Sequence, residues 1–203
     1  MTETDKIKDV FFDLFMEQLP LLSPEAKKFT RSFLTIQKYR KKEFIYRNDE
    51  VQKEIGFVCQ GLLSKYYVNE KGSVIITGFI SENGYATDYP SFLRQKPSKY
   101  NIQCLEATII VKLSYEKLQE AYLKYKGSEM YGRFVAEKVL TRETDRVESL
   151  LFESAEERYL NFLDENKDII NRISLTHLAS YLGIERQSLS RIRSKLAKNN
   201  FVT

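Results

Sequence analysis

Apolar positions along the chain recur with two periods, which predict helices near both ends and short strands between them. Residues 5–18 and 155–163 place their apolar side chains on one face, as amphipathic helices do. Between residues 34 and 113, short β-branched and aromatic runs are separated by turn residues. Strands at this spacing are typical of a barrel or a double-sheet roll. The predicted strands are 43–46, 54–59, 62–68, 74–80 and 109–113, with a hairpin turn at 69–72.

Capping residues mark the starts of further helices. Ser23, Pro24 and Glu25 supply an N-cap, a proline at the first helical position and an acid in the first turn. Ser114 caps a predicted helix over 116–123. A longer helix, predicted over about 128–152, carries a mixed stripe that fits a coiled-coil seam and a helix packed along its own domain about equally well. The members of that stripe are Tyr131, Val135, Val139, Arg142 and Arg146.

The last thirty residues have the spacing of a helix-turn-helix. Ser174 is placed to cap a first short helix, which makes His177 a residue of its first turn. Gly183 lies where the chain must turn sharply, a position that favours positive φ, and Ile184 fills the turn. The apolar positions that face inward are Leu178, Ala179 and Leu182 on the first helix, and Leu189, Ile192 and Leu196 on the second.

The opposite face of the second helix carries the long or hydrogen-bonding side chains of Arg186, Gln187, Ser190 and Arg191. A helix of this kind fits the major groove of DNA. From residue 174 to residue 203 there are five cations against one acid, Glu185, and a cationic face neutralises phosphates. An ordinary helical hairpin with a solvated basic face is the alternative that the pattern leaves open.

Composition excludes several other classes of protein. The formal net charge of +4 is modest, and no apolar run approaches the roughly twenty residues that span a bilayer. The charged N-terminus lacks the layout of a signal peptide, and Cys59 and Cys104 are expected to be buried free thiols in a cytoplasmic protein. His177 is the single histidine, which excludes a zinc site of Cys₂His₂ or His₃ type and argues against a Ser-His-Asp triad. We therefore expect no cofactor, no metal and no enzymatic activity.

A β-roll, a long helix and a C-terminal helix-turn-helix, in that order, resemble the cyclic-AMP receptor protein / Fnr family of bacterial transcription regulators. The match is best in GIERQSLSRIRSKL, residues 183–196, and the runs AEERYLNFL and LASYLGI resemble a subgroup common in Bacteroidetes. The resemblance implies an α+β fold with a cyclic-nucleotide-binding-type β-roll, a dimerisation helix and a winged helix-turn-helix. The corresponding domains are 1–127, 128–153 and 154–203.

The resemblance also implies roles for residues of the second helix. Arg186, Gln187 and Arg191 occupy base-reading positions, where arginine suits guanine and glutamine suits adenine. Phosphate contacts, which position the protein without specifying sequence, are implied for Ser190, Arg193 and Lys195. The implied partners are double-stranded DNA, a second copy of the chain as a homodimer, RNA polymerase and an unidentified small-molecule effector, with no membrane.

Two stretches depart from the family pattern. The family's nucleotide cassette places Gly-Glu, and Arg-Ser about ten residues later, around the cyclic phosphate. Thr87 and Asp88 fall at the first pair of positions, and Ser98 and Lys99 at the second. Without the arginine fork and the close approach that glycine allows, we expect that the roll does not bind cyclic AMP. A pocket for another ligand would involve Tyr85, Thr87, Asp88, Ser98 and Lys99. Because the sequence stops at Thr203, the family's C-terminal wing is expected to be absent or very short.

The sequence thus predicts a dimeric, sequence-specific DNA-binding transcriptional regulator with a sensory or purely structural roll. The alternative is a ligand-binding module whose helical C-terminal domain docks a protein partner rather than DNA. The two hypotheses differ in whether the protein binds any genomic DNA fragment at low salt. A cupin-like enzyme on the roll would need several histidines around a metal, and the roll segment contains none.

Overall fold

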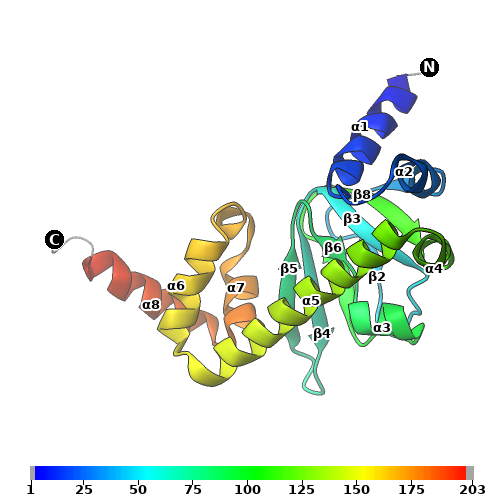
Figure 1. The fold of residues 1–203 in the computed structure, drawn as a ribbon. Coiled ribbons are helices and arrows are strands. Elements are labelled where there is room, and N and C mark those ends of the chain that lie inside the picture. Colours follow the sequence, from blue (N-terminus) through cyan, green and yellow to red (C-terminus); the bar gives the residue numbers. More distant parts are fainter. Residues whose placement is uncertain (1–2, 200–203) are drawn as a thin grey trace. The chain divides into compact units, whose positions relative to one another are not determined.

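The computed structural model describes residues 3–199, which divide into two compact units (Figure 1). The first unit comprises the chain up to residue 65 together with residues 79–140. The second comprises residues 66–78 and the chain from residue 141 onward. Helix α5 (Lys126–Phe152) runs through the division, so its first half belongs to one unit and its second half to the other.

Two four-stranded sheets form a β-roll. The strand order is β1-β8-β3-β6 in the first sheet and β2-β7-β4-β5 in the second. The first sheet is antiparallel throughout, with Ile36 opposite Val111 and Phe57 opposite both Val111 and Tyr85. The strands are β1 (Thr35–Tyr39), β2 (Phe44–Tyr46), β3 (Glu54–Gln60), β4 (Leu63–Val68), β5 (Val74–Ile80), β6 (Tyr85–Ala86), β7 (Asn101–Cys104) and β8 (Thr108–Ser114).

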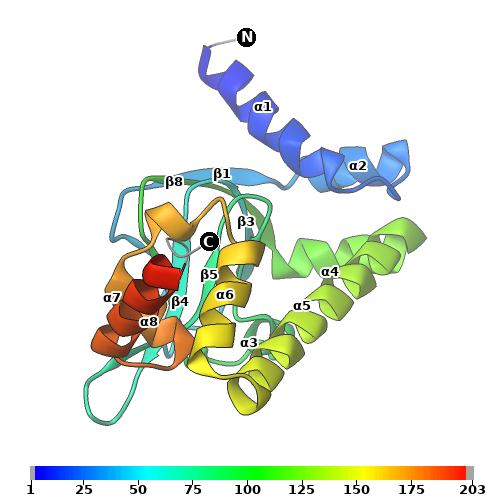
Figure 2. The same cartoon turned by 90° about the vertical axis from the view of Figure 1, so that its left-hand side faces the viewer.

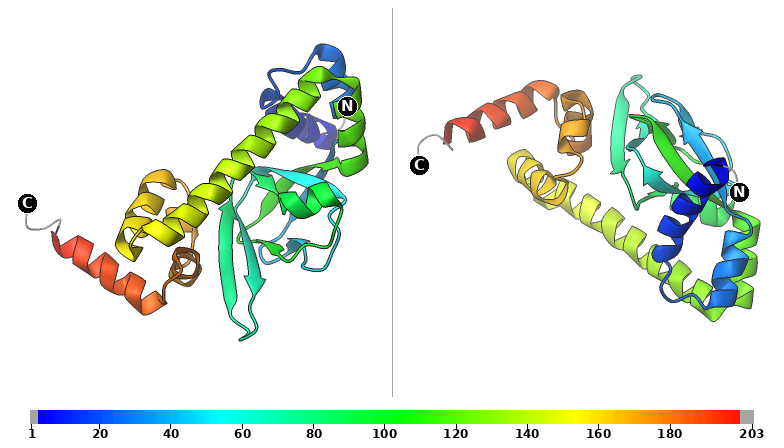
Figure 3. Two further views of the ribbon diagram at one scale, coloured as in Figure 1. Left: turned by 60° about the horizontal axis from the view of Figure 1, so that its bottom comes forward. Right: turned by 90° about the horizontal axis from the view of Figure 1, so that it is seen from above.

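Alternation along β3 divides the core of the roll into two layers. Val58 points between the two sheets, whereas Ile55 and Phe57 point to the outer face of the first sheet. That outer face is covered by α1 (Glu3–Glu17), α2 (Pro24–Arg31) and α4 (Tyr115–Lys124), together with the first half of α5 (Figure 3). The first unit therefore has a helix-covered core in addition to the interior of the roll.

Local signals in the sequence located most of these elements. Strand β5 matches its prediction, and the other predicted strands differ from β2, β3, β4 and β8 by one or two residues. The Oγ of Ser23 accepts a hydrogen bond from the Ala26 N–H at 3.2 Å, and Ser114 caps α4 in the same way, as predicted. Strands β1, β6 and β7 and the short helix α3 (Tyr89–Arg94) were not predicted, because they are short or carry exposed polar residues.

The second unit is helical apart from its share of the β4–β5 hairpin (Figure 2). From residue 154 to residue 199 it contains α6 (Ala155–Glu165), a 3₁₀ turn (Ile170–Arg172), α7 (Leu175–Leu182) and α8 (Arg186–Asn199). Ser154 begins α6 with a reciprocal capping box, in which its Oγ accepts from the Glu157 N–H and its own N–H donates to the Glu157 carboxylate. The expected short or absent wing concerns residues after Asn199, which lie outside the described residues.

The outer part of the β4–β5 hairpin is tied to α7 within this unit. Strand β5 is at the edge of its sheet, so some of its backbone groups have no strand partner. The Ser180 Oγ accepts a hydrogen bond from the Ile76 N–H and donates one to the Val74 carbonyl, both at 3.0 Å. A single hydroxyl on α7 therefore takes the place of a neighbouring strand at this edge.

Across residues 3–199, no helix has both the length and the apolar character that crossing a bilayer would require.

Candidate nucleic-acid interface

The turn between α7 and α8 is fixed by backbone geometry at both ends of α7. At its start, the Ser174 Oγ accepts a hydrogen bond from the His177 N–H at 3.1 Å, as predicted. At its end, Gly183 adopts a left-handed conformation with φ of 70°. The Ile184 N–H then reaches back to the Ala179 carbonyl at 3.0 Å, which closes the helix in a Schellman motif. The chain is thereby redirected into α8 within a few residues.

Helix α8 is held by the apolar stripe that the sequence predicted. Leu189 is fully buried, and Ile192 and Leu196 are half-buried beside it. On the other side of the contact, α7 buries Leu178 and Leu182. Because one face of α8 is committed to this contact, its other face is directed away from α7.

All six predicted DNA-contacting residues lie exposed on α8: Arg186, Gln187, Ser190, Arg191, Arg193 and Lys195. Their positions on the helix differ, however. Gln187, Ser190 and Arg191 recur at the i, i+3, i+4 spacing of one face, whereas Arg193 lies beside the apolar stripe. The same exposed face continues through Ser194 and Lys198, neither of which was among the predicted DNA contacts. Ser194 and Lys198 follow Gln187 by seven and eleven residues, and this helical spacing could have identified them from the sequence as members of the same face.

The centre of this face forms a shallow open hollow lined by polar side chains. Ser190, Arg191, Ser194, Lys195 and Lys198 line it, so three of its lining residues are positively charged and none is acidic. The Ser194 Oγ donates to the Ser190 carbonyl at 3.0 Å, which directs that hydroxyl back onto the helix. We refer to the exposed side chains of Gln187, Ser190, Arg191, Ser194 and Lys198 as the polar face of α8.

Of the cations on α8, Lys195 forms an ion pair, whereas Arg186, Arg191 and Arg193 form none among the described residues. The Lys195 ammonium lies 2.7 Å from the Glu156 carboxylate of α6, so it would have to exchange partners to meet a phosphate. Among residues 3–199, the side chains of Arg186, Arg191 and Arg193 make no ion pair and no hydrogen bond. These three guanidinium groups are therefore available to an anionic or hydrogen-bonding partner.

The second predicted site is brought together only in part. Thr87, Asp88 and Ser98 are all buried, and hydrogen bonds link them in a chain to Gln52, which is 1 % exposed. The Thr87 hydroxyl donates to the Gln52 Oε1 at 3.1 Å, as does the Asp88 N–H at 3.2 Å. The Ser98 hydroxyl donates to the Asp88 carboxylate at 2.8 Å. These hydrogen bonds occupy the positions predicted for a ligand, although the buried Gln52 Nε2 has no partner among the described residues. No local signal marked Gln52 as the partner of Thr87 and Asp88.

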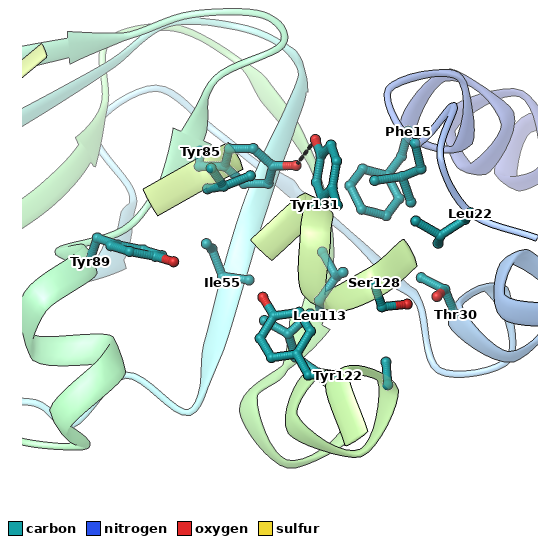
Figure 4. A pocket seen from close by; sticks show the side chains of 14 residues that line it. Phe15, Leu22, Thr30, Ile55, Tyr85, Tyr89, Leu113, Tyr122, Ser128 and Tyr131 are labelled. Carbon is teal, nitrogen blue, oxygen red and sulfur yellow. Dashed lines mark hydrogen bonds between the residues drawn. The ribbon is translucent and has the colours of Figure 1, made fainter. Parts of the chain in front are cut away.

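The remaining two residues of that predicted pocket lie elsewhere. Lys99 is exposed. Tyr85 points to the helix-covered side of the first sheet, where its hydroxyl lies 2.8 Å from the Tyr131 hydroxyl of α5 (Figure 4). Burial raises the pKa of Tyr85 well above its ordinary value, so this hydroxyl stays protonated. The predicted pocket is therefore not a single site.

The two cysteines and the histidine carry the side chains that are the usual candidates for metal binding and nucleophilic chemistry. Cys59 and Cys104 are buried free thiols, as predicted, and burial raises the pKa of each to about 11. His177 lies in the first turn of α7, and desolvation lowers its pKa. Among the described residues, no three His, Cys, Asp or Glu side chains are grouped closely enough to hold a metal ion.

Comparison with known proteins places this arrangement in a known fold. Residues 36–125 match the family model described as the cyclic nucleotide-binding domain, a range that begins at the second residue of β1 and extends past the end of α4. No curated protein is similar enough in sequence to count as a relative.

Solved structures match over most of the chain. FixK2 from Bradyrhizobium japonicum has a TM-score of 0.74 at 20 % identity, covering 82 % of this chain and 86 % of its own. A protein from Eubacterium rectale, described as a transcriptional regulator of the Crp/Fnr family, has a TM-score of 0.71 at 18 % identity, with 90 % and 88 % covered. The c-di-GMP responsive regulator CLP from Xanthomonas campestris has a TM-score of 0.67 at 15 % identity, and the match covers 88 % of this chain and 93 % of its own. The chain thus has the fold of the Crp/Fnr regulators, and its residues 36–125 are similar to the cyclic nucleotide-binding domain.

Proposed function

We propose that this protein is a homodimeric transcriptional regulator that binds a specific DNA sequence through the polar face of α8. The observation that carries the proposal is the exposed polar face of α8, which holds the unpaired Arg191 and lies on a helix whose other side packs against α7. The unpaired Arg186 and Arg193 lie outside this face on the same helix. Long, exposed donors on a rigid helix can enter the major groove and read base edges. The fold shared with Crp/Fnr regulators supports this role.

Separate roles are proposed for the residues of α8. Gln187 and Arg191 lie together on the polar face and are placed to read adjacent bases, with Arg186 at the start of the helix. Arg193, which lies beside the apolar stripe, is better placed to contact the phosphate backbone. Lys195 and Ser190 are further candidates for phosphate contacts, and Lys195 would release Glu156 to make one.

The proposal is tested by selecting genomic DNA fragments on the purified protein and comparing variants at fixed salt. Arg191→Ala is expected to weaken specific binding by about 1–3 kcal/mol and to relax the preference at one base pair. Arg193→Ala is expected to weaken binding to all DNA sequences by the same factor and to reduce the dependence of the affinity on salt concentration. Arg94→Ala, an exposed cation on α3, is the matched control and should leave both properties unchanged.

Two results would refute this assignment. Unchanged affinity and base preference in Arg191→Ala would remove that residue from the interface. The second result would be that the unmodified protein binds no genomic DNA fragment at low salt and instead binds another protein through its second unit. That result would show that the second unit docks a protein instead of DNA.

Dimerisation is proposed to use an exposed apolar seam on α5. Leu140, Val147 and Leu151 recur at intervals of seven and four residues and are 68 %, 55 % and 69 % exposed. Met130 shares this register, and Phe134 lies next to it. The mixed stripe that runs from Tyr131 to Arg146 is different. Its Val135 is buried, which fits the alternative that this part of α5 packs along its own domain.

We further propose that the roll does not bind cyclic AMP. The support is the buried carboxylate of Asp88, which is 4 % exposed and already accepts a hydrogen bond from Ser98. A cyclic phosphate at this position would bring a second negative charge close to a desolvated carboxylate, and no arginine of the cassette is present to offset it. Calorimetry with cyclic AMP is expected to detect no binding. A saturable heat with a dissociation constant below about 1 mM would contradict this part of the proposal.

A further inference from the structure

The first unit contains a cavity that is separate from the Gln52 cluster. It lies between the outer face of the first sheet and helices α1, α2, α4 and α5, and every residue that lines it belongs to the first unit (Figure 4). Its walls are formed by aliphatic side chains and by the aromatic rings of Tyr85, Tyr89, Tyr122 and Tyr131. No Lys, Arg, Asp or Glu side chain lines it, so it offers nothing to balance a charge.

Two hydroxyl groups in the cavity wall lack partners. Thr30 is 4 % exposed and Ser128 is 5 % exposed, and neither side-chain oxygen makes a hydrogen bond with the rest of the described chain. In Figure 4 the Ser128 hydroxyl of α5 points toward Thr30 of α2. Buried hydroxyls are normally hydrogen-bonded, because burying one without a partner is unfavourable. Two such groups in the wall of one cavity indicate that something else in the cavity satisfies them.

The tyrosines around the cavity also stay neutral. Desolvation raises the pKa of Tyr89 and of Tyr122, so both hydroxyls remain protonated near neutral pH. Figure 4 shows both hydroxyls directed toward the space around Ile55. Gly132 on α5 makes room for one of them, since a Cβ at this position would lie 2.8 Å from the Tyr122 hydroxyl oxygen. An occupant would therefore meet apolar surface and neutral hydroxyl groups.

The size of the cavity limits what it can hold. The centre of a water molecule could occupy about 40 Å³ of the cavity. A single water needs roughly 10–15 Å³ by this measure, so the space matches a few water molecules or one compact organic molecule of similar extent.

We propose that this cavity binds a compact, neutral, mostly apolar molecule whose one polar group hydrogen-bonds to Thr30 and Ser128. An apolar body suits the aliphatic and aromatic walls, and a single hydroxyl, carbonyl or amide satisfies the two unpartnered oxygens. Such an occupant contacts α5 through Ser128, Tyr131 and Val135, and it contacts the roll through Tyr85 and Ile55.

Methyl NMR titration of the full-length protein tests the proposal without DNA, so its result is independent of the proposed DNA binding. Propan-2-ol serves as the polar probe and xenon as the purely apolar one. With the unmodified protein, the methyl signals of Ile55, Leu113 and Val135 are expected to shift saturably with both probes. In the double variant Thr30→Val, Ser128→Ala, propan-2-ol is expected to bind about three- to tenfold more weakly while xenon binding persists.

Filling the cavity is the matched control. Ala121 is buried in its wall, and Ala121→Val is expected to abolish the response to both probes. Val135→Leu fills the same space from α5 if the first variant does not fold. The proposal is overturned if the unmodified protein shows no saturable shift or if the filled variants respond equally. It is also overturned if a crystal soaked in propan-2-ol contains only ordered water between Thr30 and Ser128.

Discussion

Gly183 shows how one residue determines the direction of α8. Its φ of 70° lies in the left-handed region, where a residue with a Cβ is strained. A Cβ at this position would also come within 3.3 Å of the Leu150 Cδ2. The requirement for glycine is therefore mainly conformational and was visible in the sequence as a turn signal.

Gly183→Ala is expected to lower the free energy of unfolding by about 1–2 kcal/mol, measured by urea denaturation. Gly72→Ala isolates the conformational part, because Gly72 has a φ of 78° and no atom within 4 Å of an added Cβ. Gly78→Ala is the control, since it has neither positive φ nor a close neighbour, and it should not destabilise the protein. Equal stability of the Gly183 and Gly78 variants would show that the turn tolerates a side chain.

Residue-level prediction succeeded where the partner is close in sequence. Ser174 and Ser23 cap helices through N–H groups three residues away, and this is a spacing that can be recognised in the sequence. It failed for Gln52, whose partners Thr87 and Asp88 are more than thirty residues distant. Such a contact depends on how the strands pair, and nothing near Gln52 in the chain indicates it.

At the scale of elements, the position of α8 depends on its packing against α7. It is a short helix of 8 residues, so its stability depends on its caps and on the packing of its buried face. Ser174 at its start and Gly183 at its end both satisfy backbone groups that would otherwise lack partners.

Ser174→Ala removes the cap and is expected to cost about 1 kcal/mol of unfolding free energy, with thermal unfolding followed by circular dichroism as the measurement. Ser174→Asp restores an acceptor for the His177 N–H and should recover the stability. If the alanine and aspartate variants are equally destabilised, the loss does not come from the cap.

The elements missed from sequence are those that the tertiary structure imposes. β1 pairs with β8 over five residues although four of its five side chains are at least partly exposed. β6 is two residues long and exists through its pairing with β3. Backbone hydrogen bonds to a neighbouring strand stabilise such segments, and side-chain patterns carry little trace of them.

At the scale of the whole molecule, the α5 seam predicts the oligomeric state. Val147→Glu or Leu151→Glu would place a charge in the proposed interface, so we expect sedimentation equilibrium to show a monomer. Leu123→Glu on α4 is the control, because this side chain is 90 % exposed and outside the seam, and it should remain dimeric. A dimer that persists in the seam variants would locate the interface elsewhere.

The sequence alone determined the features that depend on neighbours a few residues away: the helix caps, the glycine turn, the β4–β5 hairpin and the apolar stripe of α8. It also carried the resemblance from which the fold was expected. Only the tertiary structure decided that Thr87 and Asp88 hydrogen-bond to Gln52, that Ser98 hydrogen-bonds to Asp88, that Tyr85 joins Tyr131, and that two hydroxyls from separate helices share one cavity. The physical reason is that local hydrogen bonds and helical periodicity repeat at fixed spacings. Pairing between distant strands and the shape of the space between packed elements follow no such spacing.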